Sequence, residues 1–293
     1  MFPLLLFFAS LVNDVRDLIA KHDLSAAERT VRTQMKTATT PEAAAALSWV
    51  ARGALAEKQW GHAEKLAAET RALTVDLLRT RKLDADPWLP VALGAAIEVE
   101  AQARAAEGNR SEAVSFLKEQ LTAYAGTSLH ERIQKNLNLL SLTGQPTPAL
   151  DMTEWIGSKP GPVPAGRPTL MFFWAHWCAD CKGMAKAIGS VKKEFGPKGL
   201  VVVAPTRRFG YVQDGMDAPP PVEKQYIEKV RQQYYPELAD VSKPLSASNF
   251  QRYGASTTPT LVLADAAGKV RMYHPGAMSE QELAAEIRRV IGR

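Results

Sequence analysis

The feature that most constrains this chain is an apolar segment that runs directly into its only two cysteines. Residues 169–177 read TLMFFWAHW, followed by Cys178 and, three residues later, Cys181. Since the segment has the length and composition of a buried strand, Cys178 should lie at the start of a helix. A thiol there faces unsatisfied N–H groups and the positive end of the helix dipole, which stabilise a thiolate. Cys181, one turn later, is close enough to form a disulfide, so the pattern indicates thiol–disulfide exchange.

Two other interpretations of a Cys-x-x-Cys pair are open at this point. The pair is also half of a zinc site, but zinc takes four ligands and the chain has no second cysteine pair. No two of the five histidines stand at ligand spacing from each other; they are His22, His62, His130, His176 and His274. The cysteines could also be buried and chemically inert. Redox chemistry is the favoured interpretation of the three.

The surrounding residues resemble the active-site segment of the thioredoxin superfamily. The run FFWAHWCADCK at 172–182 carries the resemblance, and GRP at 166–168 is similar to the lead-in of its TlpA/ResA-like extracytoplasmic branch. Downstream, STTPT at 256–260 resembles the cis-proline loop that faces the cysteines in that superfamily. The resemblance covers residues 146–293 and implies a thioredoxin fold with a dithiol–disulfide couple.

The residue pattern of the C-terminal half predicts the same order of elements. Short apolar runs at 169–174 and 200–204 are typical of buried parallel strands, with a helical pattern between them. Strand, helix and strand make a βαβ unit. Residues 260–265 and 270–274 flank a short turn and predict a hairpin, and Ser279 opens a capping box for a last helix. An α/β domain is therefore expected.

Residues 13–145 are predicted to form a separate, all-helical domain, because they are rich in helix formers and almost free of proline. Three segments align on one small residue each, Ala27, Ala63 and Ala113, and the first spacing is near the tetratricopeptide period of about 34 residues. This half resembles a degenerate tetratricopeptide array with a docking or spacing role; an ordinary helical bundle is the alternative. Proline-rich residues 143–168 read as an extended connector.

The N-terminus and the charge bear on compartment and partners. Residues 1–12 are apolar except for Ser10 and too short to span a bilayer. They resemble a signal-peptide hydrophobic region without its basic start or a clear cleavage site; a buried first helical turn is the alternative. A chain without spare cysteines suits an oxidising compartment, so we expect a periplasmic or exported protein, with membrane association as an option. The net charge of +5 is spread over 36 basic and 31 acidic residues, which argues against nucleic-acid binding.

Two positions depart from the family pattern. Thioredoxins carry a buried aspartate where this chain has Phe172, and TlpA/ResA-like reductases often carry a glutamate where it has Met184. Those acids help to move the proton of the resolving thiol, so another group must serve Cys181. Asp180 and His176 are the nearest candidates.

Asp180 also bears on the direction of exchange. A carboxylate beside the dithiol disfavours the Cys178 thiolate. A dithiol with a less stabilised thiolate is the better electron donor. Asp180 therefore favours a reductase over an oxidase, whereas a protonated His176 would act in the opposite sense.

A long stretch at 206–221 follows the second predicted strand. It contains Arg207, Arg208, Tyr211 and Met216 and ends in three prolines. Loops of this length are usually functional or mobile. We expect it either to border the dithiol and select substrates or to decorate the edge of the domain.

The favoured function is a thiol–disulfide oxidoreductase that exchanges protein disulfides. Cys178 is expected to attack and Cys181 to resolve the mixed disulfide. By resemblance, Trp177 would shield the pair, and Thr258 and Pro259 would hold a client strand through backbone hydrogen bonds. No metal or organic cofactor is expected. Electrons would come from a membrane-embedded or soluble thiol donor.

Two rival functions use the same chain differently. A copper-handling protein would use Cys178 and Cys181 with either His176 or His274 as ligands. A scaffold would use the helical half as its main binding surface, with the redox domain as an accessory.

Overall fold

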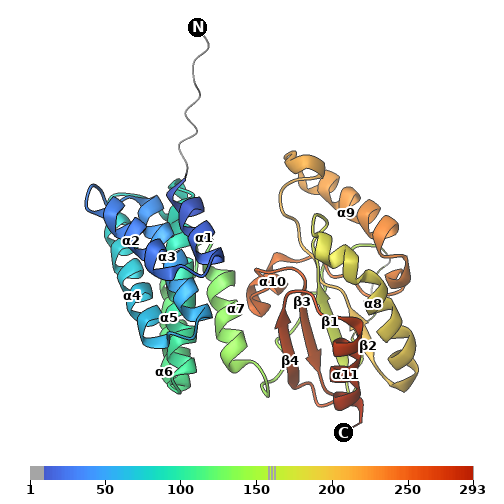
Figure 1. The fold of residues 1–293 in the computed structure, drawn as a ribbon. Helices are drawn as coiled ribbons and strands as arrows, with labels where there is room; N and C mark the ends of the chain where they lie inside the picture. The colour runs from blue at the N-terminus through green and yellow to red at the C-terminus, as the bar shows by residue number, and fades with distance from the viewer. Residues whose placement is uncertain (1–9, 158, 160, 162, 293) are drawn as a thin grey trace. The chain divides into compact units, whose positions relative to one another are not determined.

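The computed structural model describes residues 10–157, 159, 161 and 163–292 and divides them into two compact units (Figure 1). The first unit ends at Asn136 and the second begins at Leu137. Residues 1–9, which make up most of the segment that resembles a signal peptide, lie outside the described residues. Among those that are described, no helix combines the length and hydropathy needed to cross a membrane.

The first unit consists of helices in which each of the first six packs against its neighbour in the chain. They are α1 (Leu11–Ala20), α2 (Leu24–Met35), α3 (Pro41–Ala56), α4 (Trp60–Leu77), α5 (Trp88–Ala106), α6 (Arg110–Ala123) and the beginning of α7 (His130–Ser141), which continues into the second unit. Their start signals are local. Thr40 caps α3 by accepting the Ala43 N–H, and Pro41 occupies the first helical position.

Small residues allow these helices to pack closely. The buried face of α3 is mostly alanine, and α5 contributes a similar face. Ala27, Ala63 and Ala113 are fully buried, and each is the fourth residue of its helix, in α2, α4 and α6 respectively. The three aligned segments therefore occupy equivalent positions in alternate helices.

The second unit is built on a four-stranded mixed sheet with the strand order β2-β1-β3-β4 (Figure 1). Its elements are β1 (Thr169–Phe173), α8 (Ala179–Phe195), β2 (Val201–Val203), α9 (Pro220–Tyr234), α10 (Ala247–Tyr253), β3 (Thr260–Ala264), β4 (Val270–Pro275) and α11 (Glu280–Ile291). β1 and β2 are parallel, whereas β3 is antiparallel to both β1 and β4. The predicted βαβ unit, hairpin and final helix are confirmed, as is the Ser279 capping box.

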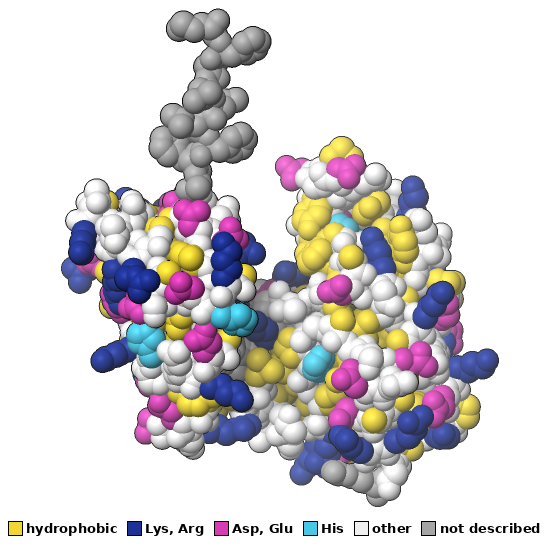
Figure 2. Space-filling view, in the orientation of Figure 1, with side chains coloured by type: hydrophobic (Ala, Val, Ile, Leu, Met, Phe, Trp, Pro, Cys, Tyr) yellow, Lys and Arg dark blue, Asp and Glu magenta, His cyan; other side chains and the backbone are white. Residues whose placement is uncertain are grey.

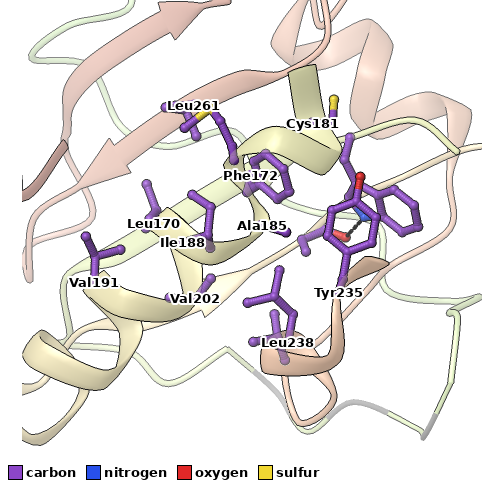
Figure 3. Packing of buried hydrophobic residues seen from close by; sticks show 14 of the residues in the cluster. Leu170, Phe172, Cys181, Ala185, Ile188, Val191, Val202, Tyr235, Leu238 and Leu261 are labelled. Atoms are coloured by element: carbon purple, nitrogen blue, oxygen red, sulfur yellow. Dashed lines mark hydrogen bonds between the residues drawn. The ribbon is translucent and has the colours of Figure 1, made fainter. Parts of the chain in front are cut away.

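Helices and loops cover both faces of this sheet. Because side chains alternate along a strand, Leu170 and Phe172 join one buried cluster with residues of α8, α9 and α11. Met171 and Phe173 join another cluster with residues of α10. Figure 3 shows the first cluster, in which Leu170 and Phe172 lie beside the apolar side chains of α8. Burial on both faces explains why β1 is a continuous apolar run.

The chain enters this unit along the edge of β4. The Gly144 N–H donates to the Val270 carbonyl at 2.7 Å, and the Val270 N–H donates to the Gln145 carbonyl at 2.9 Å. The Thr147 N–H adds a bond to the Gly268 carbonyl at 2.8 Å. Part of the proline-rich connector is therefore built into the sheet, where it satisfies backbone groups of an edge strand.

Candidate active site

The two cysteines lie at the start of α8, as the sequence predicts. Cys178 is the N-cap residue of α8, and its sulfur is bonded to that of Cys181 with 5.3 Å between the two Cα atoms. The Cys178 sulfur also accepts the Cys181 backbone N–H at 3.0 Å. After reduction this N–H and the helix dipole would stabilise a thiolate on Cys178. Cys178 is 2% exposed and Cys181 is fully buried, so both residues lie inside the protein surface when the disulfide is formed.

Trp177, which precedes Cys178 in the chain, is a large and exposed aromatic residue. Its side chain remains 48% exposed although both neighbours in the chain are buried. Its ring packs perpendicular to that of Phe209, with 5.6 Å between the centroids. A large exposed indole beside a buried disulfide offers an apolar contact to an approaching polypeptide.

The predicted cis-proline loop lies at the same end of the sheet as Cys178. The Thr258–Pro259 bond is cis. In the β1–β3 register Thr260 pairs with Phe173, so the start of β3 lies beside the end of β1. Proline has no N–H, and the Pro259 carbonyl already accepts the Gly276 N–H at 2.7 Å. Backbone hydrogen bonds to a client strand would therefore fall mainly to Thr258.

The positions of the two missing family acids are apolar and buried. Phe172 is fully buried and Met184 is 4% exposed. Figure 3 shows Cys181 and Phe172 in one cluster with Tyr235, whose pKa is raised by burial. In the same cluster the Trp174 indole donates to the Ala204 carbonyl at 3.1 Å. Neither family position offers a proton acceptor for the resolving thiol.

Of the two candidate acceptors named from the sequence, Asp180 lies in solvent. It is an exposed residue in the first turn of α8. Water and salt screen an exposed carboxylate, which reduces its effect on the nearby sulfur. The charge of Asp180 therefore gives only weak support for a reductase.

His176 occupies the opposite environment, because it is 1% exposed and enclosed by aromatic rings. The rings of Phe209, Tyr211 and Tyr226 approach it nearly edge-on, with centroid distances of 5.5, 5.3 and 5.4 Å. Burial lowers the pKa of His176, and the nearby Lys182 lowers it further. Glu223 acts against both effects.

Glu223 is a site residue that sequence reasoning missed. It is 1% exposed, and one of its carboxylate oxygens lies 3.5 Å from His176 Nε2. The carboxylate also accepts the backbone N–H groups of Phe209 and Gly210. The only local signal for it is an acidic residue in the first turn of a helix, which is common on protein surfaces.

The long loop that contains Phe209 is ordered and borders the dithiol. Tyr211 forms a β-bridge with Asp217, and the Ala218 N–H donates to the Gly210 carbonyl at 2.9 Å. The contact between Phe209 and Trp177 places this small hairpin beside the active site. The structure therefore supports the first of the two expectations for the loop, that it borders the dithiol.

An ion-pair network attaches the loop to the connector. Arg208 donates to both carboxylate oxygens of Glu154, and Lys224 donates to one of them at 3.0 Å. The hydrogen bonds from Arg208 lower the pKa of Glu154 to about 2. The network keeps the base of the loop in place next to α9.

No group of three or more His, Cys, Asp or Glu side chains in the described part of the chain could hold a metal ion. His176 is directed at Glu223, and His274 Nε2 lies 3.2 Å from the Ala277 carbonyl. The copper hypothesis therefore gains no support from the arrangement of its proposed ligands.

The second unit thus combines a Cys-x-x-Cys pair at disulfide distance, between a strand and a helix, with a cis-proline loop. Residues 163–291 match the family model described as a thioredoxin-like domain. The C-terminal half of the chain is therefore a thioredoxin-like domain, and an all-helical region precedes it.

Individual relatives and solved structures match parts of the chain. The thioredoxin-like protein slr1139 of Synechocystis sp. is 47% identical over 32 residues, which span 11% of this chain and 29% of that protein. The thioredoxin-like protein YneN of Bacillus subtilis is 28% identical over 167 residues, which span 56% of this chain and 88% of that protein. A secreted disulfide oxidoreductase of Mycobacterium tuberculosis aligns with a TM-score of 0.33 at 19% identity, covering 43% of this chain and 83% of that one.

Proposed function

We propose that this protein is a thiol–disulfide oxidoreductase that reduces protein disulfides through Cys178 and Cys181. The observation that carries the proposal is the dithiol at the helix start, with its attacking sulfur placed against a backbone N–H and its partner sulfur buried. The thioredoxin-like domain supports it.

The exchange proceeds in two steps. The Cys178 thiolate attacks one sulfur of a client disulfide, forming a mixed disulfide and releasing the other client sulfur as a thiolate. Cys181 then loses its proton and attacks the Cys178 sulfur, which releases the client and closes the Cys178–Cys181 bond. Two electrons pass from the dithiol to the client, and a donor dithiol must restore them.

The surrounding residues would bind the client. Trp177 offers an exposed apolar surface, and the backbone of Thr258 is positioned to pair with an extended client strand. The hairpin formed by residues 209–218 would select among clients, because its Met216 side chain is 60% exposed. Exposed apolar groups next to a reactive site favour binding of unfolded or extended polypeptide.

The proposed compartment is the periplasm or the cell exterior, because every cysteine in the chain is committed to the dithiol. A membrane-embedded or soluble thiol relay would supply electrons. The helical unit, for which we keep the tetratricopeptide-like interpretation, would dock protein partners. Figure 2 shows basic and acidic side chains interspersed on one face, without a continuous basic stripe for nucleic acid.

The roles of the two cysteines can be separated by trapping. With Cys181→Ser, the mixed disulfide cannot be resolved, so client proteins should remain attached to Cys178 and be visible on non-reducing gels. With Cys178→Ser, the remaining thiol is buried and few clients should be trapped. Equal trapping by the two variants would contradict the assignment. The reduction potential of the wild-type pair, measured against glutathione, decides the direction of exchange.

A further inference from the structure

The side chain of His176 is surrounded by three aromatic rings and by the buried carboxylate of Glu223. Glu223 lies within 3.5 Å of His176 Nε2, and each residue is only 1% exposed. Nε2 itself has no hydrogen-bond partner among the described residues. A proton on this nitrogen would allow it to donate a hydrogen bond to the neighbouring buried carboxylate. The edges of the surrounding rings offer no such bond.

The loop fixes the carboxylate in this position. The N–H groups of Phe209 and Gly210 donate to Glu223, and the Phe209 and Tyr211 rings contact His176. The same loop residues therefore hold the acid and exclude water from the imidazole. Burial opposes the protonated imidazole and Glu223 favours it, so a second negative charge nearby would shift the balance toward protonation.

The dithiol is the source of that charge. His176 and Cys178 are two residues apart, so their Cα atoms can be at most about 7 Å apart. Both residues are buried, and charges interact more strongly in a protein interior than in water. A thiolate on Cys178 would therefore act electrostatically on the His176 imidazole.

We propose that His176, which lies beside Glu223, takes up a proton when the disulfide is reduced and that its charge stabilises the Cys178 thiolate. The inference rests on the thiol–disulfide exchange of the proposed function. It makes His176 a proton-holding residue and Glu223 its positioning residue. A protonated His176 stabilises the reduced form of the dithiol, so it makes the couple more oxidising, in the sense opposite to Asp180.

The proton and electron balance is complete. Reduction by a donor dithiol breaks the Cys178–Cys181 bond and delivers two electrons and two protons. One proton stays on Cys181, and the other goes to His176 instead of Cys178. When the thiolate attacks a client disulfide, the histidine gives its proton to the departing client thiolate or to water. Neutral His176 is then the base available when Cys181 must lose its own proton.

The other charged and titratable groups around the imidazole are few. Lys182 on α8 opposes protonation, whereas Glu223 on α9 favours it. Tyr211 in the loop and Tyr226 on α9 contact the ring through their edges, and burial raises the pKa of Tyr211 so that it stays neutral. In the oxidised protein burial prevails, and the imidazole should be neutral at pH 7.

The test is an NMR titration of the histidines in the full-length protein, oxidised and then reduced. The chain has five histidines, and His176→Gln identifies the resonance of His176. We expect the pKa of His176 to rise on reduction far enough for the imidazole to be protonated at pH 7, because a thiolate replaces a neutral disulfide. An unchanged pKa would overturn the proposal, and this result comes from the wild-type protein without any variant.

An internal control comes from a second histidine in contact with glutamate. His62 Nε2 lies 3.0 Å from Glu28 in the helical unit, so a change in its resonance on reduction would reveal an effect that does not come from the dithiol. His176→Gln should also raise the pKa of the Cys178 thiol, because the positive charge that favours the thiolate is lost. Glu223→Gln should weaken both effects.

The proposed function has its own readout, which is the rate of insulin disulfide reduction by the wild-type protein. A wild-type protein that reduces insulin but shows a redox-independent His176 would reject the inference and keep the function. A redox-dependent His176 without insulin reduction would keep the inference and reject protein-disulfide reduction.

Discussion

Asp180 and His176 are both within two residues of a dithiol cysteine, but they lie in opposite environments. Asp180 is exposed and its charge is screened, whereas His176 is sealed beneath three aromatic rings. The proximity of Cys178 and Cys181 could be predicted, because strand, turn and first helical turn are encoded within one short segment. The contact of His176 with Glu223 could not, because it joins segments that only the folded loop brings together.

Replacing Asp180 tests how far solvent screens its charge. Asp180→Asn should stabilise the Cys178 thiolate and make the couple more oxidising, but by less than about half a pKa unit, or about 15 mV. Thiolate absorbance and equilibration with glutathione measure both quantities. A shift of a full unit would mean that the carboxylate acts directly on the sulfur.

Lys243 is another buried residue that can carry a charge, and it takes no part in the proposed exchange. It is 3% exposed and donates to the carbonyls of Leu238 and Ala239 at 3.1 and 3.0 Å. Burial lowers its pKa from 10.5 to about 8. Between these pH values the unfolded chain binds more protons than the folded protein, so the free energy of unfolding should rise with pH.

The slope should reach up to about 1.4 kcal/mol per pH unit within this window. Urea unfolding of the wild type and of Lys243→Met at several pH values measures this slope. The other groups contribute equally to both proteins, so the difference between the two is due to Lys243. A constant difference in unfolding free energy between pH 8 and 10.5 would contradict the shifted pKa.

At the scale of elements, the loop at 206–221 is the segment whose structure could be predicted least from the sequence. The loop shows no apolar periodicity from which the pairing of its residues could be predicted. Its hairpin is held instead by contacts with α9 and the connector. The strands of the sheet and the helices that cover it could be predicted, because their sequences do show periodicity. β1 and α8 show clear hydrophobic patterns, and both faces of the sheet are buried.

The ion pair between Arg208 and Glu154 allows the order of this loop to be tested. Both side chains are partly exposed, so Arg208→Met should cost only about 0.5–1 kcal/mol of unfolding free energy. Backbone hydrogen exchange in residues 207–218 should nevertheless become several-fold faster, because the base of the loop opens more readily. Arg289→Met removes the exposed pair with Glu286 on α11 and should leave exchange in the loop unchanged. Identical exchange in both variants would show that the rings alone hold the loop.

For the whole molecule, the composition of the chain suggested a boundary at residue 146, whereas the second compact unit begins at Leu137. The last part of α7 belongs to this unit because Leu142 is buried against its core and Asn138 donates to the Tyr253 carbonyl at 2.9 Å. Composition marks where prolines begin, but it does not show which helix end packs against the sheet.

Two fragments test this boundary. A fragment of residues 137–293 should unfold cooperatively. A fragment of residues 148–293 lacks Leu142 and the hydrogen bonds along β4, and should lose about 3–5 kcal/mol of unfolding free energy. Urea unfolding compares the two. Equal midpoints would show that the segment before residue 148 adds nothing to the second unit.

The backbone bonds of Gly144 and Gln145 to β4, and of Thr147 to the turn before β4, also limit how this chain can be recombined with others. If the two halves were separated at Pro146, the first proline of the connector, Gly144 and Gln145 would stay with the helical half and no longer pair with β4. The exposed edge of β4 could then pair with the edge of a neighbouring molecule. Exchange of the helical half for a different module, in evolution or in the laboratory, therefore preserves the redox domain only when residues 137–147 are inherited with it.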